Sequence, residues 1–73
     1  MTKYKIAKHL EMGIMIQNTL SLEEIGLMAT IMEFKNSGLE ITIDNLKKTT
    51  SENKIEIRKI INQLIEKNYL EEI

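Results

Sequence analysis

A helix with both of its ends marked in the sequence constrains this chain most. Ser21-Leu22-Glu23-Glu24 is a capping box, in which the Ser21 hydroxyl accepts from an amide of the first turn and Glu24 reaches back to the Ser21 amide. Gly38 suits the left-handed residue just past a helix end. We therefore expect a helix over residues 22–36.

Apolar residues cover most of the circumference of this predicted helix. One stripe consists of Leu22, Ile25, Met28, Ala29 and Met32, and a second consists of Leu27, Ile31 and Phe34. A helix that is apolar nearly all round is expected to lie at the centre of the fold. Gly26 carries no side chain, so we expect another segment to pack closely against the helix there.

Two further helices are predicted, joined by a tight polar turn at residues 49–52. Thr42 is the cap residue of a short helix that runs to about Lys48. Asn53, with Glu56 at the third helical position, caps a longer helix over residues 54–67. The apolar face of the longer helix consists of Ile57, Ile60, Ile61 and Leu64. We expect this face to anchor the longer helix on the first one.

Strand signals are short. Residues 40–43 alternate and are rich in β-branched side chains, which predicts a brief strand. Asn68 tolerates the left-handed conformation and ends the longer helix. Residues 70–73 then begin a strand with no hairpin partner after it, so we expect its edge to be open for pairing, with Glu71 and Glu72 as guards.

Composition narrows the functional classes. The 73 residues are 42% hydrophobic, contain no cysteine and carry a net charge of −1, from ten basic and eleven acidic side chains. The balance argues against an indiscriminate binder of nucleic acid or membranes, and no apolar run is long enough to span a bilayer. A chain without cysteine fits the reducing cytoplasm, where we expect the protein.

The sequence shows no pattern typical of a catalytic, metal-binding or phosphate-binding site. His9 is the only histidine and has no obvious metal-binding partners. The carboxylates are scattered, and no glycine-rich phosphate loop is present. We therefore expect no catalytic residue, no metal and no cofactor, and a protein that is not an enzyme.

The order of the predicted elements is that of a helix-turn-helix unit with a flanking strand. Three stretches, 20–29, 43–50 and 53–70, resemble the winged-helix domains of phage and plasmid replication-initiator proteins. The resemblance covers about residues 20–72. It implies a mainly α fold with a small β component, namely a winged helix-turn-helix-like domain of three helices whose wing is shortened to one strand. We place this domain at residues 20–73, preceded by an N-terminal segment of residues 1–19.

The longer helix then corresponds to the recognition helix of the family. With its apolar face inward, a 100° step per residue turns Ile55, Arg58, Lys59, Asn62 and Glu66 outward. Arg58 matches a guanine edge, Asn62 an adenine edge and Ile55 a thymine methyl group. The candidate DNA-contacting residues are Lys47, Lys48, Asn53, Lys54, Ile55, Arg58, Lys59 and Asn62. A solvated helix face is the alternative for any one of them, and Glu56 and Glu66 would repel phosphates.

Two functional interpretations stay open at this stage. The first is a DNA-binding module acting in replication initiation or transcription control of a phage or plasmid. The second is a small phage-type inhibitor or adaptor domain that keeps the fold, does not bind DNA, and binds a host or phage protein instead. Fold alone does not decide between them, because function depends on the site.

The N-terminal segment supplies a candidate interface. Its surplus apolar residues are Leu10, Met12, Ile14, Met15 and Ile16. A small domain has little core left in which to bury them, so we expect them to meet another chain, most simply a second copy in a homodimer. The alternative is that the segment folds back over Gly26 and completes the core of a monomer.

Overall fold

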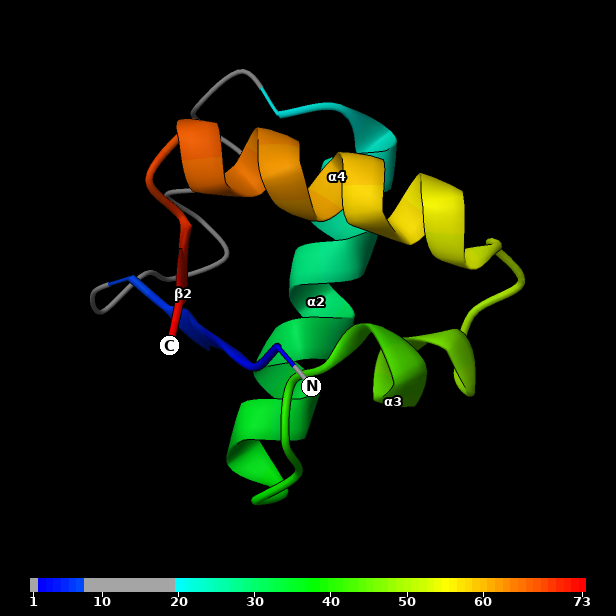
Figure 1. The fold of residues 1–73 in the computed structure, drawn as a ribbon, viewed down its shortest axis with the longest axis vertical. Helices are drawn as coiled ribbons and strands as arrows, with labels where there is room; N and C mark the ends of the chain where they lie inside the picture. The colour runs from blue at the N-terminus through cyan, green and yellow to red at the C-terminus, as the bar shows by residue number, and fades with distance from the viewer. Residues whose placement is uncertain (1, 8–19) are drawn as a thin grey trace.

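The computed structural model describes residues 2–7 and 20–73, which form three helices and a small sheet (Figure 1). In chain order these elements are β1 (Tyr4–Ile6), α2 (Leu22–Asn36), α3 (Ile43–Lys47), α4 (Lys54–Glu66) and β2 (Leu70–Glu72). The predicted mainly helical domain of three helices with a small β component is confirmed. The candidate interface residues Leu10, Met12, Ile14, Met15 and Ile16 lie outside the described residues.

Side chains at the helix ends make the capping bonds that the sequence predicts. The Ser21 hydroxyl accepts from the Glu24 amide at 3.1 Å, and Glu24 Oε1 accepts from the Ser21 amide at 2.8 Å, which completes the capping box of α2. Thr42 caps α3 by accepting from the amide of Asn45. Asn53 caps α4 in the same way. The helix starts are thus fixed by residues within one turn of them.

Left-handed residues follow two of the helices, as expected. Gly38 has φ of 72° just past α2, and Asn68 has φ of 66° just past α4. Beyond Asn68 the chain turns back, and the Tyr69 amide donates to the carbonyl oxygen of Leu64 at 2.9 Å. This return places β2 directly beside the end of α4.

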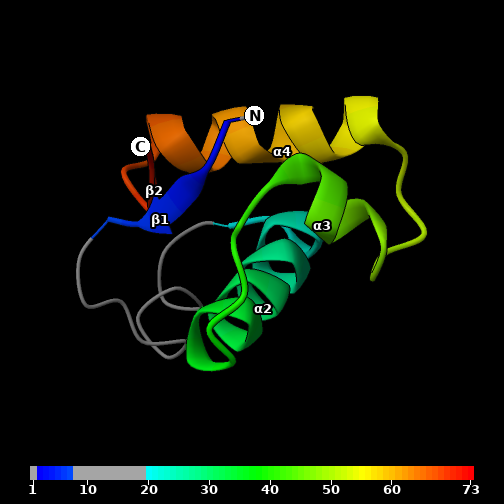
Figure 2. The ribbon, with the colours of Figure 1, turned by 60° about the horizontal axis from the view of Figure 1, so that its bottom comes forward.

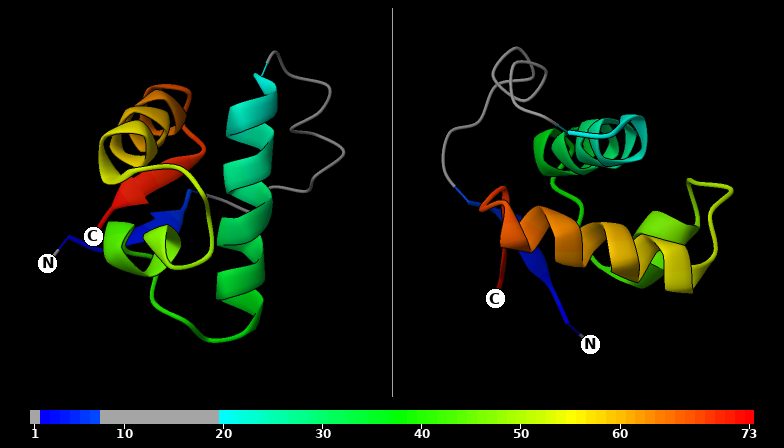
Figure 3. Two further views of the ribbon diagram at one scale, coloured as in Figure 1. Left: turned by 90° about the vertical axis from the view of Figure 1, so that its right-hand side faces the viewer. Right: turned by 90° about the horizontal axis from the view of Figure 1, so that it is seen from above.

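The core lies where α4 crosses α2 (Figure 1). Figure 3 shows α2 as one layer, with α4, the sheet and α3 forming the other. Ile57, Ile61 and Leu64 are each 0% exposed, which confirms the predicted inward face of α4. On α2 the buried apolar residues are Leu27, Met28, Ile31 and Phe34.

The first apolar stripe predicted for α2 is only partly buried. Leu22 is 88% exposed and Ala29 is exposed, because α4 and the sheet cover the opposite side of the helix. A Cβ atom built at Gly26 meets no atom of the described residues within 4 Å. The close packing expected at this glycine is therefore absent from the described part of the chain.

The sheet corrects two expectations. The strand after α4 does have a partner in the chain, because β1 pairs with β2 in antiparallel register, Tyr4 opposite Glu72 and Ile6 opposite Leu70. The strand predicted at residues 40–43 is reduced to a single bridge, in which the Tyr4 amide donates to the Ile41 carbonyl oxygen at 2.9 Å. Residues 4–6 thus lie between Ile41 and β2, within the same fold as the helices (Figure 2).

Within residues 2–7 and 20–73, none of the helices has the length and apolar character that crossing a bilayer requires. The longest of them, α2, has 15 residues.

Candidate nucleic-acid interface

The outward face of α4 is as the helical spacing predicts. Arg58, Lys59, Asn62 and Glu66 are all exposed, and Ile55 is 79% exposed. These side chains point away from a core face that is itself completely buried, so their directions are fixed by the packing of α4. An isoleucine with this exposure in the first turn gains nothing from the core and is available to a partner.

Asp44 and Lys54 join α3 to the start of α4. The Lys54 ammonium lies 2.6 Å from the Asp44 carboxylate, and both side chains are about half exposed, at 60% and 43%. The hydrogen bond from Lys54 and its positive charge lower the pKa of Asp44 below its ordinary value. A pair so open to water contributes little to stability and can be exchanged for another partner.

A hollow opens between the N-terminal strand, α3 and α4, and we call it the β1–α4 hollow. Its lining residues are Thr2, Tyr4, Ile43, Asp44, Lys54, Arg58, Asn62 and Glu72. It brings together three residues of the predicted interface, Lys54, Arg58 and Asn62. Tyr4 and Glu72 were missed from the sequence. The alternating triplet Tyr4-Lys5-Ile6 is the one signal that indicates β1, whereas the strand that holds Glu72 was predicted.

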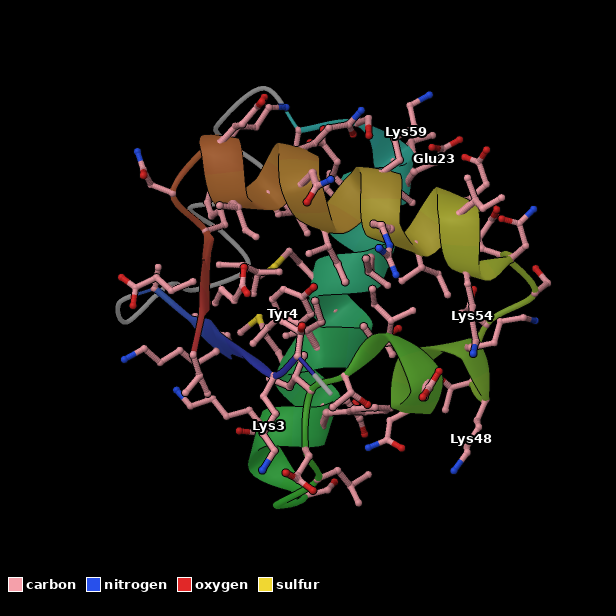
Figure 4. All side chains as sticks on the ribbon, in the orientation of Figure 1. Lys3, Tyr4, Glu23, Lys48, Lys54 and Lys59 are labelled. Carbon is pink, nitrogen blue, oxygen red and sulfur yellow. The ribbon has the colours of Figure 1, made fainter. Side chains whose placement is uncertain are left out.

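Lys59 lies apart from that group. Figure 4 shows it beside Glu23 at the start of α2, away from Lys54 and Lys48. Together with Gln63 and Lys67 it lines a second hollow, over the first turn of α2. The predicted interface therefore spans two flanks of α4 and is not one compact patch.

The remaining candidates are placed differently. Lys48 is exposed and Lys47 is partly buried, and both lie at the end of α3, on the side of the turn that leads to α4. Asn53 is exposed, but its side-chain oxygen accepts from the Glu56 amide at 2.8 Å. That oxygen is occupied in capping α4, which gives Asn53 a structural role whatever else it contacts.

Ion pairs are distributed unevenly among the basic residues. Lys3 pairs with Glu40, Lys5 with Glu71, Lys54 with Asp44 and Lys67 with Glu24. In the described part of the chain the basic residues without an ion pair are Lys35, Lys47, Lys48, Arg58 and Lys59. All of these except Lys35 belong to α3, its C-cap and α4, a stretch that also carries Glu52, Glu56 and Glu66, which have no ion pair among the described residues.

Glu24 is a buried carboxylate. The sequence predicted its part in the capping box of α2 but neither its burial nor its ion pair. It is 2% exposed, and its Oε1 atom accepts from the Lys67 ammonium at 2.9 Å as well as from Ser21. Burial raises the pKa of Glu24, but the hydrogen bonds from the Ser21 amide and from Lys67 outweigh it, so the pKa lies below its ordinary value of 4.5. The other oxygen, Oε2, has no partner among the described residues.

The described residues also contain no cluster of three histidine, cysteine or carboxylate side chains able to hold a metal ion. The candidate interface presents hydrogen-bond donors and acceptors, surrounded by lysine and arginine side chains that have no ion pair among the described residues. Comparison of the chain with family models, curated proteins and solved structures finds no match.

Proposed function

We propose that the domain binds duplex DNA through α3, the following turn and α4, as a winged helix-turn-helix module. The setting is replication initiation or transcription control of a phage or plasmid. The observation that carries the proposal is the placement of the uncompensated cations. Lys47, Lys48, Arg58 and Lys59 have no ion pair within the described residues, and all lie on the helix-turn-helix unit. Neutralising phosphates with such cations is the main source of affinity for DNA.

In this proposal the first half of α4 enters the major groove. Arg58 bonds a guanine edge, Asn62 an adenine edge, and Ile55 touches a thymine methyl group. Lys47 and Lys48 hold phosphates on one side of the groove, and Lys59 does so on the other. The exposure of Arg58, Lys59 and Asn62, together with the 79% exposure of Ile55, supports these roles.

The sheet supports the winged form of the proposal. A wing strand beside the end of the recognition helix is the position that β2 takes, and its antiparallel partner is β1. In this chain the partner strand comes from the N-terminal residues. The sequence had predicted a wing of one strand alone. The wing-like sheet thus has two strands of three residues each.

The test is titration of the full chain with fluorescent mixed-sequence duplex at several salt concentrations. We expect binding that weakens as salt is raised, because counterions are released on binding. The Arg58→Ala, Lys59→Ala double variant should bind more weakly at every salt concentration. Wild-type affinity in that variant would contradict the assigned site, and no binding by the wild-type chain at low salt would contradict the function.

A protein-binding domain is the second candidate, and one observation favours it. Leu22 and Ile55 are large apolar residues that are 88% and 79% exposed, and the carboxylates of Asp44 and Glu72 line the β1–α4 hollow, where they would repel phosphates. Affinity capture that yields one host or phage protein and no nucleic acid would support this candidate. Sedimentation at two concentrations tests the homodimer.

A further inference from the structure

Tyr4 is a buried residue whose hydroxyl group makes no hydrogen bond to another described residue. The residue is only 9% exposed and belongs to the core cluster, yet it also lines the β1–α4 hollow. Its hydroxyl group makes no hydrogen bond within residues 2–7 and 20–73, and it is not among their buried unsatisfied atoms. Since Tyr4 lines the hollow, its hydroxyl group is the polar group that β1 offers to a ligand there. Figure 4 shows Tyr4 between β1 and α3.

The position of this hydroxyl group is fixed by the sheet. The Tyr4 amide donates to the Ile41 carbonyl oxygen at 2.9 Å, and Tyr4 pairs with Glu72 on the other side. One residue earlier, the Lys3 carbonyl oxygen accepts from the Ile73 amide at 2.9 Å. A tyrosine held in this way loses little conformational entropy when its hydroxyl group binds a ligand.

The hollow is lined by two positive and two negative side chains, of which only one pair is in contact. Asp44 is compensated by Lys54 at 2.6 Å. Arg58 has no ion pair among the described residues, and Glu72 has none either. The hollow thus offers donors from the Arg58 guanidinium, the Tyr4 hydroxyl group and the exposed side chains of Thr2 and Asn62, opposed by the Glu72 carboxylate.

We infer that the N-terminal strand is part of the DNA contact, with the Tyr4 hydroxyl group holding one backbone phosphate of the bound duplex beside the base edge that Arg58 reads. The inference rests on the proposed function. A tyrosine hydroxyl group is a common donor to DNA phosphates, and the guanidinium group that lines the same hollow adds a favourable positive charge. Glu72 weakens the contact by repulsion and limits the affinity of the site.

Tyr4→Phe tests the inference because it removes one oxygen atom and keeps the ring in the core. We expect duplex affinity at low salt to fall by about tenfold to a hundredfold, the range for one hydrogen bond to a charged group. The loss should be equal for two duplexes of unrelated sequence, because phosphates carry no sequence information. Tyr69→Phe is the matched control, since Tyr69 is equally buried at 7% but does not line the hollow.

Glu72→Gln tests the same contact with the opposite sign. Removing its charge should raise duplex affinity, and the rise should shrink as salt is added. Glu71→Gln is the control next to it in sequence, because Glu71 is paired with Lys5 on the other face of β2 and does not line the hollow. Thermal melting of all four variants establishes that each one folds.

The outcomes separate this inference from the function beneath it. Salt-dependent binding by the wild-type chain with unchanged affinity in Tyr4→Phe would overturn the Tyr4 contact and leave the proposed function standing. A loss in Tyr4→Phe for one duplex sequence only would assign Tyr4 to a base and also overturn the phosphate contact. Absence of duplex binding by the wild-type chain would overturn both.

Discussion

The two faces of α4 differ sharply in burial. On the inner face Ile57, Ile61 and Leu64 are 0% exposed, whereas Ile55 on the outer face of the same helix is 79% exposed. Only the inner residues leave water when the chain folds, so stability depends on them. The outer residues contribute little to stability and are available to contact a partner. Substitutions on the two faces should therefore separate effects on stability from effects on affinity.

Two lysine–carboxylate pairs extend this comparison to the ends of α4. Lys54 lies 2.6 Å from Asp44, and Lys67, the C-cap residue, lies 2.9 Å from Glu24. The distances are similar, but Asp44 is 43% exposed and Glu24 only 3% exposed in its side chain. Because water reaches both members of the first pair but only Lys67 in the second, the second is the one whose loss should lower the stability of the fold.

Leu64→Ala should have the largest effect. Truncating a fully buried leucine costs about 2–5 kcal/mol of unfolding free energy, which is a large share of what a small domain has. Ile55→Ala removes an apolar side chain from the same helix and should change the unfolding free energy by no more than about 0.5 kcal/mol. Urea denaturation of both variants measures the difference. Equal midpoints would show that the inner and outer faces are assigned the wrong way round.

Glu24→Gln should have the next largest effect. Glutamine can keep the capping box with Ser21. The substitution therefore isolates the effect of removing the negative charge that pairs with Lys67. We expect a loss of about 1–3 kcal/mol in unfolding free energy. Glu23→Gln is the control, because Glu23 is exposed and makes no ion pair within the described residues. Equal stability of the two variants would show that the buried pair contributes nothing.

The same carboxylate sets a dependence on pH. Because the pKa of Glu24 is lower in the folded state than its ordinary value of 4.5, its contribution is fully present above that value. It is lost as pH falls through the folded-state pKa. Urea midpoints of wild type and Glu24→Gln should therefore differ at neutral pH and converge in acid. A constant difference down to the lowest pH at which both fold would contradict this assignment.

Arg58→Ala and Lys59→Ala should affect binding and leave stability unchanged. Both side chains are exposed, but Arg58 lines the β1–α4 hollow whereas Lys59 lies on the flank beside Glu23 (Figure 4). Loss of a base contact by Arg58 should weaken binding by about tenfold and relax sequence preference. Lys59→Ala should weaken all duplexes equally and lower the salt slope by about one. Identical behaviour of the two variants would argue against separate flanks.

Asp44→Asn should have the smallest effect on the fold. The pair with Lys54 is exposed to water, so the melting temperature should not change within the error of a thermal scan. Duplex affinity should rise slightly, because a carboxylate leaves the hollow and Lys54 becomes free for a phosphate. A marked fall in melting temperature would show that this pair holds α3 on α4.

The sequence was sufficient where the interactions are local. Ser21 and Asn53 cap their helices through hydrogen bonds to amides within one turn. Asn68 ends α4 through its own left-handed conformation. Because these features are local, the sequence predicts the helix ends correctly. The inner face of α4 was equally predictable, because its apolar residues recur at one spacing. On α2 apolar residues surround the helix, so no spacing could indicate that Leu22 would be exposed.

Contacts between distant residues were beyond sequence reasoning. Glu24 and Lys67 are 43 positions apart, and nothing in either segment indicates the other. The pairing of Tyr4 with Glu72 is more distant still. For the candidate site, the outward residues of α4 were correctly placed, but the wall of the hollow formed by β1 was missed because its three-residue strand is too short to give a clear pattern.

The pairing of β1 with β2 has a consequence for the order of folding. Joining Tyr4 to Glu72 closes a loop of nearly the whole chain, and the entropy of closing it must be overcome before the strand contacts are gained. The helices are built from local contacts and should collapse first, with β1 docking last. Native-state hydrogen exchange should then find the Tyr4 amide opening at lower free energy than the Ile61 amide. The β1–α4 hollow would be complete only in molecules whose folding has finished.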